Sequence, residues 1–338
     1  MQSFFKKLPR YSLRLLLAYL VYIFTGGVLA YLLPRQARNL PQTDSFYGIG
    51  RGPDRAVLVE EPQDAFARRV EVIRTAQSTL DVCYHCVKSG ETTECFFAEL
   101  LRAADRGVRV RVLLDGTVGG LSGARSNIAL ALRAHPNIEY RIYNPVDLLR
   151  PWEWNALLHD KFILADDRML LLGGRNIGDE YFAPPGYEGA VTYDRDVLVL
   201  NDLAGTPDSS ESVTAQAKIY MDTLWDAPET DKFGTLSPSR RADGLAAQEY
   251  LKETAARWEA AAPSFYLPSE PASQCAVPTQ RVTLLHNPVS PFKKEPTLGA
   301  TLAQLLSGCQ KIRLQTPYAT ANPSTLAALT RLAKQGHV

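Results

Sequence analysis

The sequence has almost no surplus of charge of either sign. Its 37 lysine and arginine residues are balanced by 36 aspartate and glutamate residues, so the formal net charge is +1 over 338 residues. A protein that binds nucleic acid through its overall field needs an excess of positive charge, and any phosphate site here must be local. With 46% hydrophobic and 22% charged residues, the composition also excludes a long disordered, collagen-like or coiled-coil chain.

Cysteine is also scarce. The chain has five cysteines, an odd number, spread over its length at Cys83, Cys86, Cys95, Cys275 and Cys309. This spacing is not typical of a disulfide framework. The first three superficially resemble metal ligands, but no second ligand pair follows them. We therefore expect buried or loop cysteines and no metal site.

One long hydrophobic run stands out from this composition. Residues 15–33 read LLLAYLVYIFTGGVLAYLL and contain no charged side chain, close to the ~20 residues that a helix needs to cross a bilayer. Basic residues flank the run, and its tyrosines suit the two membrane interfaces. We predict a transmembrane helix rather than a cleaved signal, whose apolar part is usually ~7–15 residues long. The flanking charges favour a cytoplasmic N-terminus and an extracytoplasmic catalytic domain.

Strand-like and helix-like patterns alternate in the middle of the sequence. Short hydrophobic runs predict strands at 79–84, 108–115, 138–143, 161–165, 168–173 and 196–200. Apolar residues at helical spacing predict helices around 66–73, 97–104 and 213–224. Gly107 is expected to end the second of these helices. The alternation predicts an α/β domain built on a βα-rich sheet.

A similar order of elements recurs near the end of the sequence. Residues 311–318 read as a strand and are followed by a polar loop and a helical pattern. Aligning Gly336 with Gly107 brings a leucine, an arginine and an alanine opposite the same residue types. This agreement indicates an internal duplication at long period.

The expected organisation follows from these patterns. It comprises a basic N-terminus (1–14), a transmembrane helix (15–33), a linker (34–55), a first repeat (56–225), a connector with a short helix near 246–261 (226–280), and an incomplete second repeat (281–338).

A cluster of polar residues surrounds the predicted strand at 161–165. His159, Lys161 and Asp166 fit the pattern H-x-K-x4-D, and the run GGRN, ending at Asn176, follows shortly after. Because alternate residues of a strand share a face, the imidazole and the ammonium should converge on one pocket. A neutral imidazole can attack phosphorus, and a lysine cation or an amide can bind phosphoryl oxygens. The pattern therefore predicts phosphodiester chemistry.

This segment resembles the HKD motif of the phospholipase D superfamily. Its extension through GGRNIGDEYF and DRDVLVL is similar to the bacterial cardiolipin synthase and phosphatidyltransferase branch. The resemblance implies an α/β/α sandwich with duplicated halves that each carry one motif. It also implies that one histidine forms a phosphohistidine intermediate while the other protonates the leaving group, with no metal and no cofactor.

The resemblance assigns roles to individual residues. His159 is implied to be catalytic, while Lys161, Asn176 and Gly174 are implied to bind the substrate phosphate. The implied substrate is a phospholipid, phosphatidylglycerol or a similar lipid, in a bacterial cell membrane that the chain crosses once. No nucleic-acid partner is expected.

Three aspartates complete the implied site. Asp166 is the aspartate of the motif, which is usually more structural than catalytic. Asp196 opens the next predicted strand and fits the acid that holds the second ring nitrogen of a catalytic histidine and fixes its tautomer. Asp194 is the alternative for that role.

The sequence contains no second H-x-K-x4-D. None of the other four histidines is followed by lysine two residues later. At the spacing of the first repeat, the second histidine would fall beyond Val338. We expect either a fragment of a two-motif enzyme or a homodimer in which each chain contributes one histidine. We favour the fragment, because half a repeat would expose an apolar sheet edge.

Two further functions stay open beside a membrane-anchored phosphatidyltransferase that makes cardiolipin. One is a hydrolase of the same superfamily, either a phospholipase or a nuclease. The other is a catalytically incomplete, membrane-tethered half that binds lipid. Just ahead of the motif, Trp152 and Trp154 either enter the lipid headgroup layer or pack beside the site.

Overall fold

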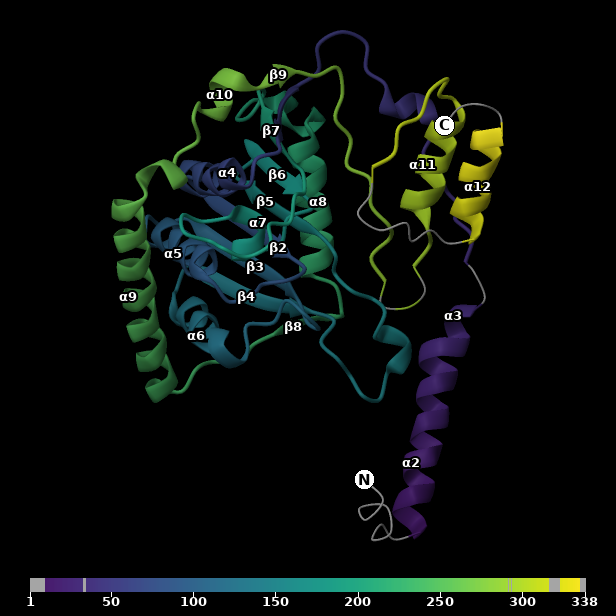
Figure 1. Ribbon diagram of the computed structural model, residues 1–338, viewed down its shortest axis with the longest axis horizontal. Coiled ribbons are helices and arrows are strands. Elements are labelled where there is room, and N and C mark those ends of the chain that lie inside the picture. The colour runs from purple at the N-terminus through teal and green to yellow at the C-terminus, as the bar shows by residue number, and fades with distance from the viewer. Residues whose placement is uncertain (1–9, 33–34, 291, 293, 316–322, 335–338) are drawn as a thin grey trace. The chain divides into compact units, whose positions relative to one another are not determined.

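The computed structural model describes residues 10–32, 35–290, 292, 294–315 and 323–334. The chain divides into two compact units (Figure 1). One, here called the sheet unit, consists of Gly48–Val146 and Leu157–Leu284. The other, here called the helical unit, is assembled from Met1–Tyr47, Asp147–Ala156 and Leu285–Val338.

A mixed sheet forms the centre of the sheet unit, and in the described part of the chain it has nine strands in the order β8-β4-β3-β2-β5-β6-β7-β1-β9. Strands β2, β3 and β4 are parallel to one another, and the other neighbouring pairs are antiparallel. The strands are β1 (Asp54–Val59), β2 (Thr79–Tyr84), β3 (Arg109–Asp115), β4 (Ile138–Tyr143), β5 (Lys161–Ala165), β6 (Met169–Gly173), β7 (Asp196–Asn201), β8 (Thr230–Lys232) and β9 (Val277–Pro278). All six predicted strands of this region are confirmed.

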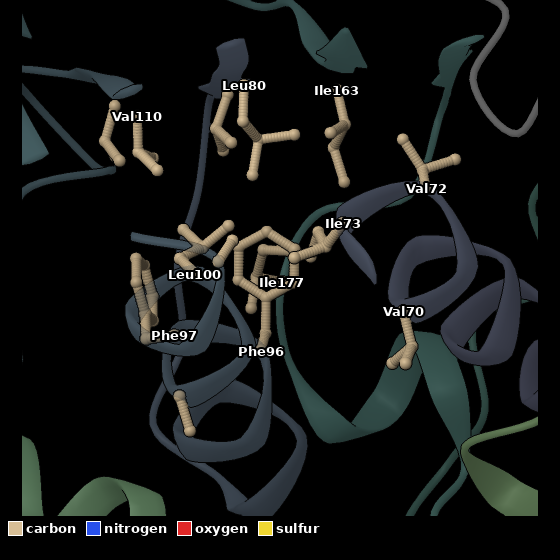
Figure 2. Packing of buried hydrophobic residues seen from close by; sticks show 14 of the residues in the cluster. Val70, Val72, Ile73, Leu80, Phe96, Phe97, Leu100, Val110, Ile163 and Ile177 are labelled. Atoms are coloured by element: carbon tan, nitrogen blue, oxygen red, sulfur yellow. The ribbon is translucent and has the colours of Figure 1, made fainter. Parts of the chain in front are cut away.

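Helices cover both faces of the sheet, as the predicted α/β/α sandwich requires (Figure 1). One face carries α4 (Pro62–Thr75), α5 (Glu91–Asp105) and α6 (Ser126–Ala134), and the other carries α8 (Val213–Trp225). Figure 2 shows Leu80, Val110 and Ile163 of the strands pointing toward Phe96 and Leu100 of α5. Burial on both faces explains why the central strands read as nearly continuous hydrophobic runs.

The end of α5 follows directly from the sequence. Gly107 adopts φ +93°, a left-handed conformation that glycine accepts without a steric penalty. Its N–H donates to the carbonyl of Ala104, and the N–H of Val108 donates to that of Ala103. These bonds satisfy carbonyls at the helix end, so the predicted stop at Gly107 is confirmed.

The expected connector contributes to the sheet unit. Its predicted short helix is α9 (Pro238–Ala261), which has 24 residues and packs against α5 and α6. A β-carbon on Gly244 would lie 2.6 Å from that of Ala134, so this glycine lets α9 approach α6 closely. The same segment supplies β8 and β9, the two edge strands of the sheet.

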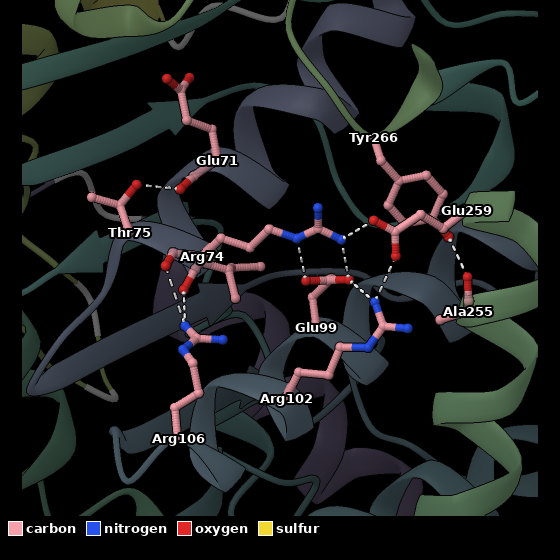
Figure 3. Close-up of polar contacts among 10 residues, drawn as sticks. Glu71, Arg74, Thr75, Glu99, Arg102, Arg106, Ala255, Glu259 and Tyr266 are labelled. Carbon is pink, nitrogen blue, oxygen red and sulfur yellow. Dashed lines mark hydrogen bonds and ion pairs between the residues drawn. The ribbon is translucent and has the colours of Figure 1, made fainter. Parts of the chain in front are cut away.

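An ionic network fixes α9 to the rest of the unit (Figure 3). Glu99 of α5 is buried and accepts two hydrogen bonds of 2.9 Å from Arg74 of α4. Glu259 of α9 accepts from Arg74 at 2.7 Å and from Arg102 at 2.9 Å. Burial alone would raise the pKa of Glu259, but the two arginines outweigh it and hold this pKa below its usual value.

Glu99→Ala is therefore expected to destabilise the protein. The change leaves two arginines without their shared buried carboxylate, and because both guanidinium groups are partly exposed we expect a loss of about 2–3 kcal/mol in the free energy of unfolding. Urea denaturation measures this loss. The matched control is Glu249→Ala on the exposed side of α9, where Glu249 contacts Lys252. Equal losses for the two variants would contradict the proposed role of the network.

The helical unit begins with the apolar segment. Helix α2 (Arg10–Ile23) continues through a π-helical stretch (Phe24–Leu29) into α3 (Ala30–Leu32). Tyr11–Leu29 is a candidate membrane span of 19 residues with mean hydropathy 1.7. The predicted helix is thus present over its described part, and Leu33 lies outside the described residues.

The duplication is not confirmed. Residues 311–315, the described part of the strand expected at 311–318, are not in a strand, and 316–318 lie outside the described residues. The predicted helix after them is α12 (Pro323–Lys334), and α11 (Thr297–Ser307) precedes it. A strand needs a neighbour that pairs its backbone N–H and C=O groups, and the described residues of this unit form helices and loops.

Candidate active site

The candidate site lies where three strands of the sheet unit meet. Parallel β2 and β3 have their carboxyl ends at the same edge, and antiparallel β5 begins there. His159 lies two residues before β5, and His85 directly follows β2. Since Tyr84 pairs with Lys161 across the two strands, the topology brings two histidines that are far apart in sequence to one place.

The two imidazole rings are neighbours. Their centroids are 4.5 Å apart and the planes are tilted by 54°. Nδ1 of His85 lies 2.8 Å from the carbonyl oxygen of Leu158, which fixes the ring beside His159. His159 itself is exposed to solvent, so a substrate can reach it.

Lys161 is the first residue of β5 and lies next to this pair. Its side chain is 6% exposed, and Nζ donates a hydrogen bond of 2.7 Å to the carbonyl oxygen of His159. Burial lowers the pKa of Lys161, while the carboxylates of Asp160 and Asp194 act in the opposite direction. The structure therefore brings His159 and Lys161 together, as the two-residue spacing predicts.

Asn176 is anchored to the segment that carries His85. Its Oδ1 accepts a hydrogen bond of 3.0 Å from the N–H of Cys86, and its Nδ2 donates to the hydroxyl of Tyr181 at 3.2 Å. The next residue, Ile177, forms an isolated β-bridge with Val87. These contacts place the amide beside the site and fix its orientation.

The paired glycines have a different role from the expected one. A β-carbon on Gly174 would lie 2.0 Å from a carboxylate oxygen of Asp194, and one on Gly173 would lie 2.0 Å from an oxygen of Asp196. The N–H of Gly174 donates to the carbonyl of Arg195 at 3.0 Å. The assignment of Gly174 to phosphate binding is therefore corrected, because a carboxylate occupies the space that this glycine leaves open.

Asp196 also differs from its expected role. Its Oδ2 accepts hydrogen bonds from Arg69 at 3.0 Å and from Arg175 at 3.1 Å, and all three residues are buried. Burial raises the pKa of Asp196, but the two guanidinium groups outweigh it and hold that pKa below its usual value. Among the described residues, the partners of this carboxylate are arginines rather than His159. Asp196 is therefore part of a buried ion cluster, not the acid that orients the catalytic histidine.

Asp166 lies at the other end of β5 from His159. It has φ +53°, and its carboxylate accepts hydrogen bonds from the backbone N–H groups of Gln77, Ser78 and Thr79. These three bonds hold the turn that leads into β2. This placement fits the structural role that the family resemblance implies for the motif aspartate.

His85 and Asp115 were missed from the sequence. Asp115 ends β3 and is buried; its Oδ2 accepts a hydrogen bond of 2.8 Å from the N–H of Leu158 and lies 3.9 Å from Nδ1 of His85. Their position in the sequence could have revealed them. Both residues lie at the carboxyl ends of predicted parallel strands, where ligands commonly bind. Cys83 and Cys95, which resembled metal ligands, are buried in the core.

The surroundings favour a neutral His159. Partial burial lowers its pKa most, and Lys161 and His85 lower it further, while the carboxylates of Asp160 and Asp115 act in the opposite direction. Together these influences lower the pKa of His159 from its usual value of 6.5. Because only the neutral ring has a free lone pair for attack, the nucleophilic form persists into mildly acidic solution.

A pH profile tests this inference. If neutral His159 is the reactive form, kcat/KM rises with pH through the lowered pKa, so the acidic limb has its midpoint below 6.5. The variant His85→Phe keeps an aromatic ring beside His159 but removes the charge of His85, which lowers the pKa of His159. We therefore expect the midpoint of the acidic limb to move to higher pH. His286→Asn, in an exposed loop, is the control. An acidic limb that does not move in His85→Phe would contradict the influence of His85.

Comparisons with known proteins agree with this geometry. Residues 70–199 match the family described as cardiolipin synthase, PLD-like domain. Cardiolipin synthase C of Escherichia coli is 39% identical over 152 residues, which is 42% of this chain and 31% of that protein. An uncharacterized protein of Helicobacter pylori is 39% identical over 138 residues, 38% of this chain and 27% of that protein. The chain thus spans less than a third of the length of these relatives.

A solved structure gives the same result for the fold. Phosphatidylserine synthase of Haemophilus influenzae matches with a TM-score of 0.55 and 14% identity, covering 87% of this chain and 62% of that one. At this identity the likeness concerns the fold alone.

Proposed function

Because residues 70–199 are a phospholipase D-like domain of the cardiolipin synthase branch, we propose that the protein is a membrane-anchored phosphatidyltransferase. Its proposed substrate is phosphatidylglycerol or a similar phospholipid, and its proposed product is cardiolipin. The observation that carries the proposal is the neighbourhood of His159 and Lys161, in which the imidazole is exposed and the buried ammonium donates to the backbone carbonyl of His159. A candidate nucleophile thus lies close to a cation that can bind a phosphodiester.

The first step transfers the phosphatidyl group to the protein. A ring nitrogen of neutral His159 attacks the phosphorus of phosphatidylglycerol, a nitrogen–phosphorus bond forms, and the bond from phosphorus to the glycerol oxygen breaks. The departing oxygen takes a proton from a general acid and leaves as glycerol. Lys161 and Asn176 stabilise the charge that develops on the other phosphoryl oxygens.

The second step transfers the group to another lipid. A hydroxyl of a second phosphatidylglycerol attacks the phosphohistidine and gives its proton to the group that acted as the acid. The nitrogen–phosphorus bond breaks, and His159 is regenerated. Two phosphatidylglycerol molecules thus yield cardiolipin and glycerol. Transfer rather than hydrolysis requires that the acceptor lipid exclude water from the intermediate.

The general acid in this scheme is the histidine of a second HKD motif. We propose that it comes from a second copy of this chain in a homodimer or from a longer form of the protein. Intact mass and the molar mass in detergent solution distinguish these two sources. The anchor is the apolar helix at Tyr11–Leu29, which would keep the site at its lipid substrate.

The test is a product analysis in vesicles that contain labelled phosphatidylglycerol. Flotation of the vesicles reports whether the full chain is anchored, and mass spectrometry identifies the products. Cardiolipin with an equal amount of glycerol is the expected result. Phosphatidic acid as the only lipid product would establish a hydrolase instead. Bound protein without turnover, with the molar mass of a dimer, would support a lipid-binding half and overturn the transferase.

A further inference from the structure

A loop of the helical unit is held along the apolar helix. This loop, Asp147–Ala156, has the sequence DLLRPWEWNA and ends just before the motif, from which Leu157 and Leu158 separate it. Three tyrosine hydroxyls of the helix donate hydrogen bonds to three backbone carbonyls of the loop. The pairs are Tyr19 with Leu148 at 2.8 Å, Tyr22 with Leu149, and Tyr31 with Trp152.

The helix also makes room for the loop. A β-carbon on Gly26 would lie 3.1 Å from the ring of Pro151, and one on Gly27 would lie 3.2 Å from its carbonyl oxygen. Both glycines belong to the π-helical stretch (Phe24–Leu29), where the regular helix is locally widened. The rings of Tyr22 and Trp152 meet edge to face with centroids 6.2 Å apart. Hydrogen bonds and shape thus fix the loop on one side of the helix.

Two leucines of the loop are exposed, and nothing in the described residues covers them. Leu148 is 62% exposed and Leu149 is 73% exposed. The charges of the loop lie close to one another, with Arg150 3.5 Å from Asp147 and 3.7 Å from Glu153. The indole N–H of Trp154 donates to the carbonyl of Asp147 at 2.7 Å. Arg150 and Asp147 are themselves 60% and 46% exposed, so the loop presents a compensated charge pair and two leucines together at its surface.

We infer that loop 147–156 is inserted into the lipid leaflet beside the apolar helix. The inference rests on the proposed membrane anchoring of that helix. Irregular backbone enters a bilayer only where its carbonyls have protein partners, and here the three tyrosines supply them. Tryptophan, paired charges and exposed leucines together suit the boundary between headgroups and acyl chains.

The occupant of this surface is therefore lipid rather than another protein. The loop packs against a helix of membrane-spanning length that carries no charge from Leu15 to Leu32, and none of the candidate span is buried by the rest of the chain. A helix in the bilayer exposes its attached loop to the same acyl chains. Because the loop leads directly into the motif, its insertion would keep His159 near the headgroup phosphates of the lipid.

Tryptophan fluorescence provides the test. The chain has four tryptophans, of which Trp152 and Trp154 belong to the loop while Trp225 and Trp258 belong to the sheet unit. The full chain is reconstituted in phosphatidylglycerol and phosphatidylcholine vesicles, with or without bromine on the acyl chains. We expect brominated lipid to quench about half of the wild-type emission, because two of the four indoles contact acyl chains. In Trp152→Phe/Trp154→Phe the remaining emission should be insensitive to bromine.

A second pair of variants tests the docking itself. Gly26→Leu keeps the helix apolar but places a side chain where Pro151 lies, so quenching should fall although the protein still floats with the vesicles. Val28→Leu is the matched control and should be quenched like wild type.

The outcomes separate this inference from the proposed anchoring. If the protein floats and the loop variant is quenched as strongly as wild type, the inserted indoles are elsewhere and the inference fails alone. If the protein floats and no variant is quenched, the loop lies in water or against another protein chain, and again the inference alone is overturned. If the protein does not float, both the anchoring and the insertion are wrong.

Discussion

His159→Gln is expected to abolish phosphatidyl transfer while the fold is retained. The amide has no ring nitrogen that can form a bond to phosphorus, and removing the nucleophile of such a site costs at least about 10⁴-fold in kcat. Because His159 is exposed, the free energy of unfolding should change by less than about 0.5 kcal/mol. Vesicle assays with labelled phosphatidylglycerol and urea denaturation measure the two quantities.

The matched control is His286→Gln, which changes an exposed histidine outside the candidate site. It should leave both turnover and stability unaltered. Trapping adds a direct readout, since wild-type protein quenched in denaturant at mildly alkaline pH should carry a labelled phosphohistidine that the His159 variant lacks. A His159→Gln protein with more than about one-tenth of the wild-type turnover would refute the assigned nucleophile.

Asp196→Asn is expected to have the largest effect on stability. The buried carboxylate neutralises Arg69 and Arg175, and its loss leaves two buried guanidinium groups without a counter-charge. Breaking a buried ion pair on one side costs about 3–5 kcal/mol, a large share of the stability of an ordinary domain. Thermal and urea unfolding should therefore both shift strongly downward.

Asp194→Asn separates this effect from any role in the reaction. Asp194 lies two residues earlier and is not fully buried, so its substitution should cost less than about 1 kcal/mol. If Asp196→Asn instead unfolds like wild type and moves the acidic limb of the pH profile, the carboxylate orients His159 after all. Asp196 would then be an acid that orients His159 rather than only a member of the buried ion cluster.

Six of the nine described strands could be predicted, because central strands such as β2 and β5 are buried on both faces, whereas β1, β8 and β9 were not predicted. A hydrophobic run such as TLDVCY, which forms β2, predicts a strand by itself. The prediction does not depend on which strands lie beside it in the sheet. The same holds for Lys161, whose position relative to His159 follows from two residues of extended chain. Features that depend only on residues close together in the sequence can therefore be predicted from the sequence.

Contacts between distant segments could not be predicted in this way. Asp196 bonds to Arg69, which lies 127 positions earlier in the chain, and no spacing rule connects the two. His85 comes beside His159 only because β2 and β5 are paired, a fact of topology rather than of sequence. The strand expected at 311–318 is absent from its described part, 311–315, because a hydrophobic run becomes a strand only when another strand pairs with it.

Both borders of the sheet are formed by segments that are translated after the other seven strands. The three residues of β8 pair with β4, and the two residues of β9 pair with β1. While the ribosome has released only the residues before 230, both outer strands present unpaired N–H and C=O groups to other nascent chains. The interval between the synthesis of β7 and that of β9 is therefore when aggregation threatens this protein most, and chaperone binding would be most useful then.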